Sequence, residues 1–241
     1  MQNVRILTAG DSSLLVEFGS EISPEINRKI AATVQLMREQ HIEGIVDVIP
    51  TYCSLLVNYD LRVVGYDEMK KRLEDLVRVD VKTGAGVRTV VEIPVCYGGE
   101  YGPDLPGIAE HAGLSEEEVI RIHTSRDYLI YMLGFLPGFT YLGGLDERIH
   151  TPRLPNPRLS IPAGSVGIGG SQTGIYPLDS PGGWQLMGMT PVKTYDPERE
   201  TPILVEAGQY IRFVEIDEER YLRIKEEVAR GEYQCVIHRE G

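Results

Sequence analysis

The stretch from Ser160 to Trp184 gathers residue types that could contact a polar ligand. Its sequence, SIPAGSVGIGGSQTGIYPLDSPGGW, mixes glycines with hydroxyl, amide and indole side chains. Glycines in strands often mark the close approach of a ligand, and accessible backbone N–H groups bind carboxylate, carbonyl or phosphate oxygens. The candidate contacts are Gly164, Ser165, Ser171, Gln172, Thr173, Tyr176 and Trp184. The alternative is a system of tight turns that only packs a small barrel, and the sequence leaves both interpretations open.

Known signature motifs do not account for this stretch. GIGGSQTG has no P-loop lysine and no helix pattern after it, GxGxxG fails at Gln172, and GxSxG fails at Thr173. The histidines are scattered and no His/Cys cluster has metal spacing, so no metal site is predicted. The valines and isoleucines that alternate with the glycines exclude a flexible linker. These observations alone do not establish an enzyme.

The preceding loop, residues 133–158, contributes cations and aromatic rings. Its sequence, LGFLPGFTYLGGLDERIHTPRLPNPR, could line a groove for a small molecule or an extended partner. Arg153 and Arg158 lie among prolines, so two rigidly presented guanidiniums could grip an anion; solvent-exposed loop charges are the alternative. His123 lies in the last turn of a short helix, where a lone histidine is more often packed or capping than functional.

Length and charge limit the class of protein. The 241 residues suffice for one large or two small domains, and the formal net charge of −12 argues against nucleic-acid binding and against an anionic membrane surface. No apolar run of about 18 residues predicts a membrane span, and the N-terminus lacks a signal-peptide pattern, so we expect a cytoplasmic protein. The three cysteines form no CxxC, so no disulfide framework is predicted.

The first third of the chain alternates strands and helices. Strands are predicted over 12–18, 45–50, 54–60 and 87–97, and helices over 24–40 and 66–80. Ser23 supplies an N-cap and Pro24 a first helical position for the first helix. This order is that of a ferredoxin-like α/β sandwich. The last strand either closes this sheet or begins the next domain.

The small polar segment Lys82–Gly86 predicts a domain boundary, with an N-terminal α+β domain over 1–86 and a second domain over 87–241. In the second domain, short helices are predicted over 105–113 and 115–125. Prolines and glycines from 134 to 202 exclude a long helix there, and short strands between turns indicate a β-barrel or sandwich. Two strands are predicted within 202–216, and a late helix over 217–231.

Four segments carry a resemblance to a known family. GFLPGFTYLGGLD, TPRLPNPR, IPAGSVGIGGSQTGIYPLDSPGGW and CYGGEYGPDL resemble the family of 5-oxoprolinase B subunits (PxpB), which also contains the kinase inhibitor KipI and proteins named as the first subunit of allophanate hydrolase. The resemblance covers essentially the whole chain. One position departs from it: Met189 stands in GMTP where the family usually has Gly-Arg-Thr-Pro, so the cation of that arginine is missing here.

The resemblance implies a ferredoxin-like α+β domain followed by a C-terminal cyclophilin-like β-barrel. It further implies a non-autonomous component of an ATP-dependent 5-oxoprolinase, which opens 5-oxo-L-proline to L-glutamate together with the A subunit and the KipA-like C subunit of that enzyme. The C subunit is sometimes fused to the B subunit. ATP would be bound in the complex, and neither a metal nor a biotin site is evident in this chain.

This hypothesis gives most of the candidate residues a role. The backbone amides from Gly164 to Gly174, with Gln172 and Thr173, stabilise developing negative charge. Arg153 and Arg158 hold a carboxylate or a phosphate. His123 and Tyr176 transfer protons or orient the reacting groups.

Two other functions stay open within the same resemblance. KipI-like members bind the dimerisation helices of a sensor histidine kinase and block its autophosphorylation, a task that a groove rich in proline and aromatic residues would suit. The same pair of domains resembles the carboxyltransferase part of urea carboxylase, which needs a biotinylated acceptor, and this sequence has no biotinyl Met-Lys motif. Neighbouring genes for the other oxoprolinase components or for a biotin carboxylase would discriminate between these functions.

Overall fold

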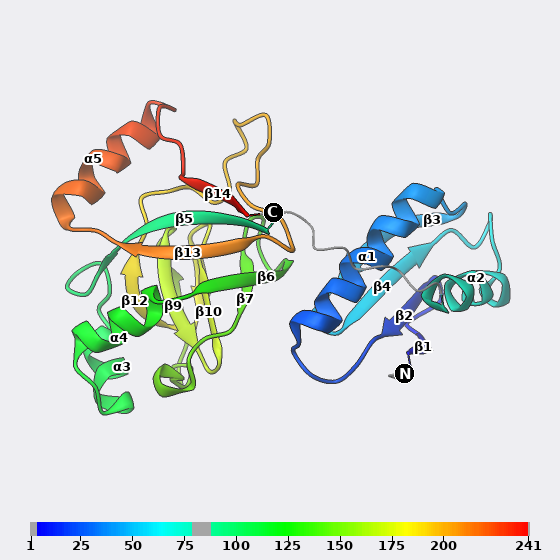
Figure 1. Ribbon diagram of the computed structural model, residues 1–241, viewed down its shortest axis with the longest axis horizontal. Coiled ribbons are helices and arrows are strands. Elements are labelled where there is room, and N and C mark those ends of the chain that lie inside the picture. Colours follow the sequence, from blue (N-terminus) through cyan, green and yellow to red (C-terminus); the bar gives the residue numbers. More distant parts are fainter. Residues whose placement is uncertain (1–3, 79–87, 241) are drawn as a thin grey trace. The chain divides into compact units, whose positions relative to one another are not determined.

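The computed structural model describes residues 4–78 and 88–240 of the chain (Figure 1). The chain divides into two compact units, residues 1–86 and residues 87–241. The boundary segment predicted at Lys82–Gly86 lies outside the described residues. Each unit has a hydrophobic core of its own and is treated by itself below.

The first unit is an antiparallel sheet packed against two helices. Its elements are β1 (Arg5–Thr8), β2 (Ser13–Glu17), α1 (Pro24–Gln40), β3 (Ile45–Pro50), β4 (Ser54–Tyr59) and α2 (Tyr66–Arg78). The strand order is β1-β2-β4-β3. Strand alternation turns Leu14, Val16, Leu55 and Val57 toward one face, where they share a core with the apolar sides of both helices.

Local signals account for most of this first unit. The helix α1 has the predicted bounds, and the Ser23 side chain accepts a hydrogen bond from the Glu25 N–H as its N-cap. The sequence pattern did not indicate β1, which pairs antiparallel with β2 at the sheet edge. The strand over residues 88–97, for which two places were open, belongs to the second unit and not to this sheet.

The second unit is built on a closed barrel. Its strands are β5 (Arg88–Tyr97), β6 (Asp127–Leu133), β7 (Thr140–Gly143), β9 (Ser165–Gly169), β10 (Gln172–Ile175), β12 (Gln185–Met189) and β13 (Tyr210–Glu215). They follow one another in the order β12-β9-β10-β7-β6-β13-β5, and pairing of β12 with β5 closes the ring. The β13–β5 pair is parallel and the other pairs are antiparallel. The predicted α+β class with a C-terminal barrel is confirmed.

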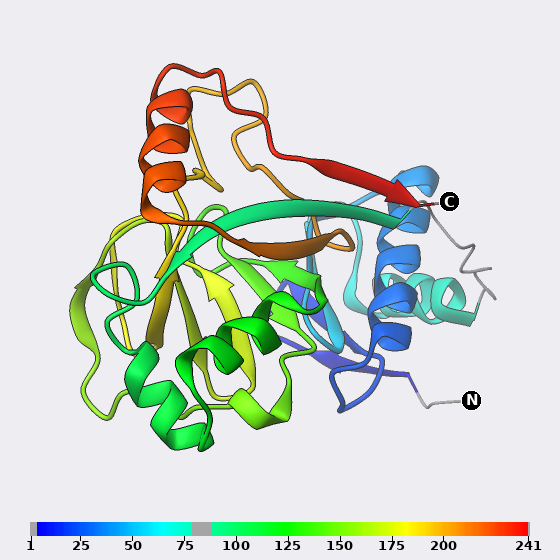
Figure 2. The same ribbon diagram turned by 60° about the vertical axis from the view of Figure 1, so that its left-hand side comes forward.

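Shorter elements surround this barrel. They are α3 (Leu105–Ala112), α4 (Glu116–Thr124), the 3-10 helix η1 (Glu147–Ile149), β8 (Arg158–Ile161), β11 (Ser180–Gly182), α5 (Glu218–Ala229) and β14 (Ile237–Glu240). α3 and α4 bury Ile108, Val119 and Ile122 in the barrel core. The helix α5 lies on the outer side of β5 (Figure 2). Its Tyr221 and Ile224 side chains pack with Cys96 of that strand. No helix in the described part of the chain is long and apolar enough to cross a membrane.

One strand prediction in this unit is wrong. Residues 202–209 contribute only an isolated bridge between Ile203 and Tyr195, and the regular strand begins at Tyr210. The apolar residues of this segment serve packing instead of pairing, because Val205 is buried in the barrel core and Leu204 packs against it.

Candidate functional site

Strands β9 and β10 place different residue types on their two faces. Val166, Ile168 and Ile175 lie in the barrel core, and Thr173 is fully buried beside them. The residues that alternate with them, Gly167, Gly169 and Gly174, therefore lie on the outer face. The alternation of branched residues with glycine thus follows from a wall that is packed closely on both sides.

Trp184 explains two of these glycines. A Cβ atom at Gly169 would lie 2.3 Å from the indole Nε1 of Trp184, and one at Gly174 would lie 3.1 Å from its Cζ3. Real Cβ atoms make no contact as short as the first, so any side chain at Gly169 would displace the ring. The outer face of β9 and β10 is therefore a seat for the only tryptophan of the chain.

The indole belongs to a group that we call the outer aromatic cluster. Its buried members are Phe139, Ile161, Tyr176, Trp184 and Leu186. The Phe139 ring centroid lies 5.6 Å from both the Tyr176 and the Trp184 centroids, in edge-to-face geometry. Tyr176 is 3% exposed, and its burial raises the pKa of the phenol. The predicted site residues Tyr176 and Trp184 are thus side by side in a packed cluster.

The two arginines predicted to hold an anion both lie beside this cluster, but only one of them is bound to a carboxylate. The Arg153 side chain is exposed, with its guanidinium 5.9 Å from the Trp184 ring and its Nη2 donating to Gln172 Oε1 at 3.5 Å. Within the described residues, Arg153 has no carboxylate in ion-pair range. Its charge therefore faces solvent over an aromatic ring, a setting that suits an incoming anion.

Arg158 is bound to other groups of the protein. Its Nη2 donates to Asp104 Oδ1 at 2.7 Å, and its Nη1 donates to the Trp184 carbonyl at 3.3 Å. The other carboxylate oxygen of Asp104 accepts the Leu186 N–H at 2.6 Å. The Asp104–Arg158 pair therefore fixes the backbone on both sides of Gln185, and Arg158 positions Trp184 instead of presenting a free cation. No signal in the sequence pointed to Asp104 as this partner.

The backbone amides of the glycine-rich stretch are largely occupied by the barrel. The Gly164 N–H donates to the Tyr176 carbonyl at 2.7 Å, that of Ser165 to Pro162 at 3.2 Å, and that of Gly170 to Thr151 at 2.8 Å. These three amides do not offer free donors to a ligand. Gly164 also has a φ of +86°, and a Cβ there would lie 2.4 Å from the Thr190 carbonyl oxygen.

The remaining polar candidates of this stretch are separated. Ser171 is exposed in the turn between β9 and β10, and Gln172 is half-buried at the start of β10. Ser165 is 1% exposed, and its hydroxyl has no hydrogen-bond partner among the described residues. Thr173 faces the barrel interior, away from all of these. Gln172 is thus the polar side chain that the structure brings to Arg153.

His123 and Thr173 belong to a second constellation, the inner hydroxyl–imidazole chain, together with Tyr97. The Thr173 hydroxyl donates to the Gly167 carbonyl at 3.0 Å, so its oxygen accepts the proton of His123 Nε2 at 2.8 Å. His123 Nδ1 is then the acceptor and takes the Tyr97 O–H at 2.8 Å. Every polar atom of the imidazole is satisfied within the barrel, in its neutral Nε2–H tautomer.

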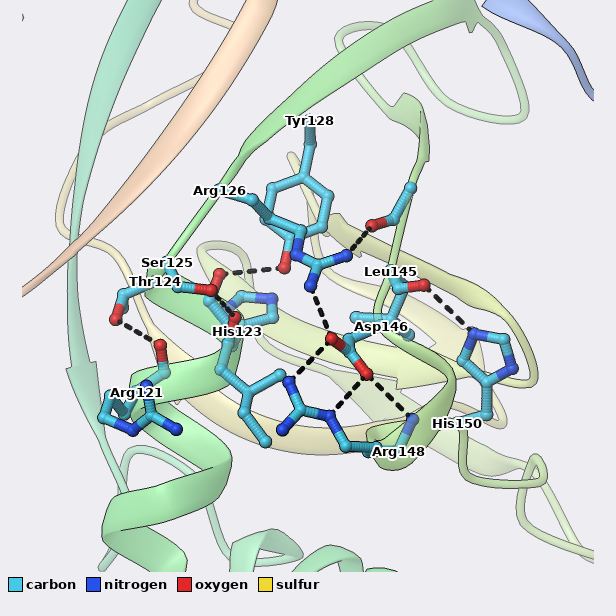
Figure 3. Close-up of polar contacts among 12 residues, drawn as sticks. Arg121, His123, Thr124, Ser125, Arg126, Tyr128, Leu145, Asp146, Arg148 and His150 are labelled. Carbon is cyan, nitrogen blue, oxygen red and sulfur yellow. Dashed lines mark hydrogen bonds and ion pairs between the residues drawn. The ribbon is translucent and has the colours of Figure 1, made fainter.

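Burial fixes the charge state of this histidine. His123 is fully buried and stacks on Phe213, with ring centroids 4.5 Å apart. Desolvation lowers its pKa to about 3, because no carboxylate compensates for burial of the imidazolium. The Tyr128 hydroxyl donates to the His123 carbonyl at 2.8 Å and anchors the end of α4 (Figure 3). A neutral, enclosed histidine can orient its neighbours, but it does not reach a surface ligand.

An ion cluster next to this corner holds the start of β6 to the 3-10 helix. Asp146 accepts hydrogen bonds from Arg148 Nε at 2.9 Å and from Arg126 Nη2 at 2.5 Å (Figure 3). The bonds from Arg148, with the charge of Arg126, hold the pKa of this carboxyl well below its usual range. The two guanidiniums and the carboxylate pair with one another, so we assign these residues a structural task. No group of His, Cys, Asp and Glu in the described part of the chain could hold a metal ion.

The fold and this site define a class: a two-unit α+β protein whose glycine-rich barrel wall seats an aromatic cluster. The family described as Carboxyltransferase domain, subdomain C and D, matches residues 4–205. The 5-oxoprolinase B subunit of Bacillus subtilis (strain 168) is 45% identical over 228 residues, which cover 90% of this chain and 95% of that protein.

Two solved structures are also similar. TTHA0988 has 39% sequence identity and a TM-score of 0.75, and the match covers 85% of this chain but 40% of that longer chain. The K. lactis urea amidolyase, at 21% identity and a TM-score of 0.83, covers 98% of this chain and 16% of its own, and shows the shared fold. The chain belongs to the carboxyltransferase subdomain C and D family and, within it, to the group of 5-oxoprolinase B subunits.

Proposed function

We propose that this chain is the B subunit of an ATP-dependent 5-oxoprolinase that opens 5-oxo-L-proline to L-glutamate together with the A and C subunits. The observation that supports it most strongly is the 45% identity to a protein named as the 5-oxoprolinase B subunit, over nearly the full length of both chains. The resemblance of the segments around the outer aromatic cluster points to the same activity.

Under this proposal the surface at Arg153 receives the anionic part of the substrate. 5-Oxoproline carries one carboxylate beside its lactam, and Arg153 is an exposed guanidinium without an acidic partner in the described residues. Gln172 lies against it, with its Oε1 accepting a hydrogen bond from Arg153 Nη2. Arg158 positions this surface through Asp104 and the Trp184 carbonyl. The neutral His123 supports the same wall from inside the barrel.

The chemistry explains why the chain would need partners. A lactam is a stable amide, so ATP-coupled opening would pass through a phosphorylated intermediate that must be kept from water. Arg153 is exposed, and the backbone amides at Gly164, Ser165 and Gly170 are already bonded to carbonyls. The remaining walls of the site, and ATP, would come with the A and C subunits.

The test is reconstitution. Glutamate formation from 5-oxoproline and ATP is followed with the A and C subunits, with and without this chain. We expect glutamate only when this chain is present, and at least a ten-fold loss of kcat/KM with Arg153→Met. The matched control is Arg148→Met, which removes an arginine that is bound to Asp146. A folded three-component complex that forms no glutamate would contradict the proposal.

A carboxyltransferase role is the second candidate, because the matched family is described as a carboxyltransferase domain and the fold recurs in a urea amidolyase. Transfer of a carboxyl group from carboxybiotin to urea, measured with a biotinylated acceptor protein, would distinguish it from lactam opening. Inhibition of a sensor histidine kinase and a cytoplasmic location stay predictions of the sequence.

A further inference from the structure

The hairpin between β6 and β7 carries an aromatic residue in an unusual backbone conformation. Phe135 has a φ of +66°, and the Leu136 N–H donates to the Gly134 carbonyl across it at 2.8 Å. A hydrogen bond between residues i and i+2 around a positive φ defines a strained γ-turn. Bulky residues are rarely found at positive φ, where glycine is the residue without penalty.

The turn is held rigidly. The Phe139 N–H donates to Leu136 at 3.0 Å, and the Gly134 N–H donates to Phe139 at 3.3 Å. The flanking Gly138 has a φ of +78° and lies against the backbone of Thr194. The loop therefore keeps one shape, and the aromatic residue stands at its most strained point.

Folding does not account for the phenyl ring. Its side chain is 63% exposed, and Phe135 is the one aromatic residue among the large exposed hydrophobic side chains in the described part of the chain. The Phe139 ring contacts it edge to face, with centroids 5.4 Å apart. Strain at an exposed residue that supports no core indicates that the ring is kept for an interaction.

Phe135 is continuous with the outer aromatic cluster. Ring contacts run from Phe135 to Phe139 and from Phe139 to Trp184, and the Arg153 guanidinium lies over the Trp184 ring. The surface thus presents the rigidly held phenyl ring of Phe135 and the guanidinium of Arg153 on one packed aromatic cluster. Aromatic side chains of this kind, preorganised on a packed base, dominate binding energy at protein interfaces.

We propose that Phe135 is the anchor that docks this chain onto the C subunit, by entering an apolar pocket of that subunit. The inference rests on the proposed function for the identity of the partner. The longer TTHA0988 chain supports it, because this chain matches 40% of that chain and a further protein part is therefore joined to the matched segment there.

The experiment measures binding and not turnover. The full chain is titrated with the purified C subunit by calorimetry, and Phe135→Ala is compared with the wild type. Loss of a hot-spot aromatic should raise the dissociation constant by about 30-fold or more. The control is Leu222→Ala on α5, a half-exposed apolar side chain outside the cluster, which should leave the affinity unchanged.

Phe135→Gly separates docking from folding. Because glycine relieves the positive φ, this variant should unfold at the same temperature as the wild type or higher, and still bind as weakly as Phe135→Ala. Wild-type affinity in both variants, or no binding of the wild type to the C subunit, overturns the docking proposal. Tight wild-type binding and Phe135-dependent affinity in a complex that forms no glutamate would leave docking standing and contradict the oxoprolinase function alone.

Discussion

Two polar constellations lie on opposite faces of the barrel wall formed by β9 and β10, and they differ in which polar groups are left without a partner. In the inner hydroxyl–imidazole chain, Tyr97 and Thr173 satisfy both ring nitrogens of His123, and the Thr173 hydroxyl donates to the Gly167 carbonyl. On the outer face, the aromatic cluster supports Arg153, whose charge remains exposed. Residue types able to do chemistry therefore act structurally where each donor has found its acceptor. Residual binding capacity lies on the outer face.

We expect the largest change in the free energy of unfolding at Gly169, in the barrel wall that separates the two faces. Gly169→Ala would drive a methyl group into the Trp184 ring, where neither the strand nor the packed indole can move freely. We expect a loss of about 3 kcal/mol in the free energy of unfolding. Urea unfolding followed by the fluorescence of Trp184 measures it. Gly107→Ala, in α3 with open space around it, should instead stabilise by roughly 0.5–1 kcal/mol. Equal, small effects would contradict the seat assigned to Trp184.

The inner chain should respond to loss of a hydroxyl. Thr173→Val keeps the shape of the side chain but leaves the Nε2–H of His123 without an acceptor in the barrel core. The unfolding free energy should fall by about 2–3 kcal/mol. Ser171→Ala, in the exposed turn nearby, is the control and should change it by less than about 0.5 kcal/mol. A Thr173→Val protein as stable as the wild type would mean that the buried chain is not needed for folding.

Acid should weaken the fold through His123. Its pKa is about 3 in the folded protein, and the imidazole is neutral there, whereas in the unfolded chain it takes up a proton near pH 6.5. The unfolded state therefore binds more protons between these values, and stability is full above about pH 6.5 and falls as the pH is lowered toward 3. Between pH 6.5 and 5 the loss is about 2 kcal/mol.

His123→Gln tests that assignment. The variant is less stable at neutral pH, but it lacks the titrating group, so its stability should fall less steeply between pH 6.5 and 5. Urea unfolding of both proteins at the two pH values gives the difference. Identical slopes would show that the imidazole does not enter the folded protein in its neutral form.

The smallest expected changes in the free energy of unfolding distinguish Arg158 from Arg153. Arg158→Met removes the partner of Asp104 and should lower the unfolding free energy by about 1 kcal/mol, since the pair is partly exposed. Arg153→Met should change it by less than about 0.5 kcal/mol, because no ion pair is lost in the described residues. Thermal unfolding of the two variants side by side measures this. The reverse order would place the structural arginine at 153.

Part of this architecture could be predicted from the sequence because its signals are local. Pro24 after the Ser23 cap sets the start of α1, and the capping hydrogen bond from Glu118 N–H to Ser115 sets the start of α4. The strands β1 and β14 escaped prediction because each has only four residues and is largely exposed. β1 forms by pairing with β2, and β14 forms by pairing with β5, which is far away in the sequence. Their existence is decided by tertiary pairing, not by local propensity.

At the candidate site, too, the sequence did not predict features that depend on tertiary structure. The sequence identified Arg153, Arg158, Gln172 and Thr173 as polar candidates, but it did not predict which face of the wall each would occupy. A shift of one residue along β10 separates Gln172 on the outer face from Thr173 inside the barrel. The spacing of the arginines likewise held no sign of Asp104, which lies far earlier in the chain and neutralises only the second of them.

The most direct test compares two variants in the reconstituted complex of this chain with the A and C subunits. Arg153→Met and Tyr97→Phe are each assayed for glutamate formation per folded complex, and for thermal stability. We predict that Arg153→Met keeps the wild-type unfolding temperature and loses at least ten-fold in kcat/KM, while Tyr97→Phe unfolds at a lower temperature and keeps the turnover of the folded fraction. The opposite pattern, full activity without Arg153 and lost activity in a stable Tyr97→Phe protein, would place the chemistry inside the barrel and contradict the assignment of the binding surface to the outer face.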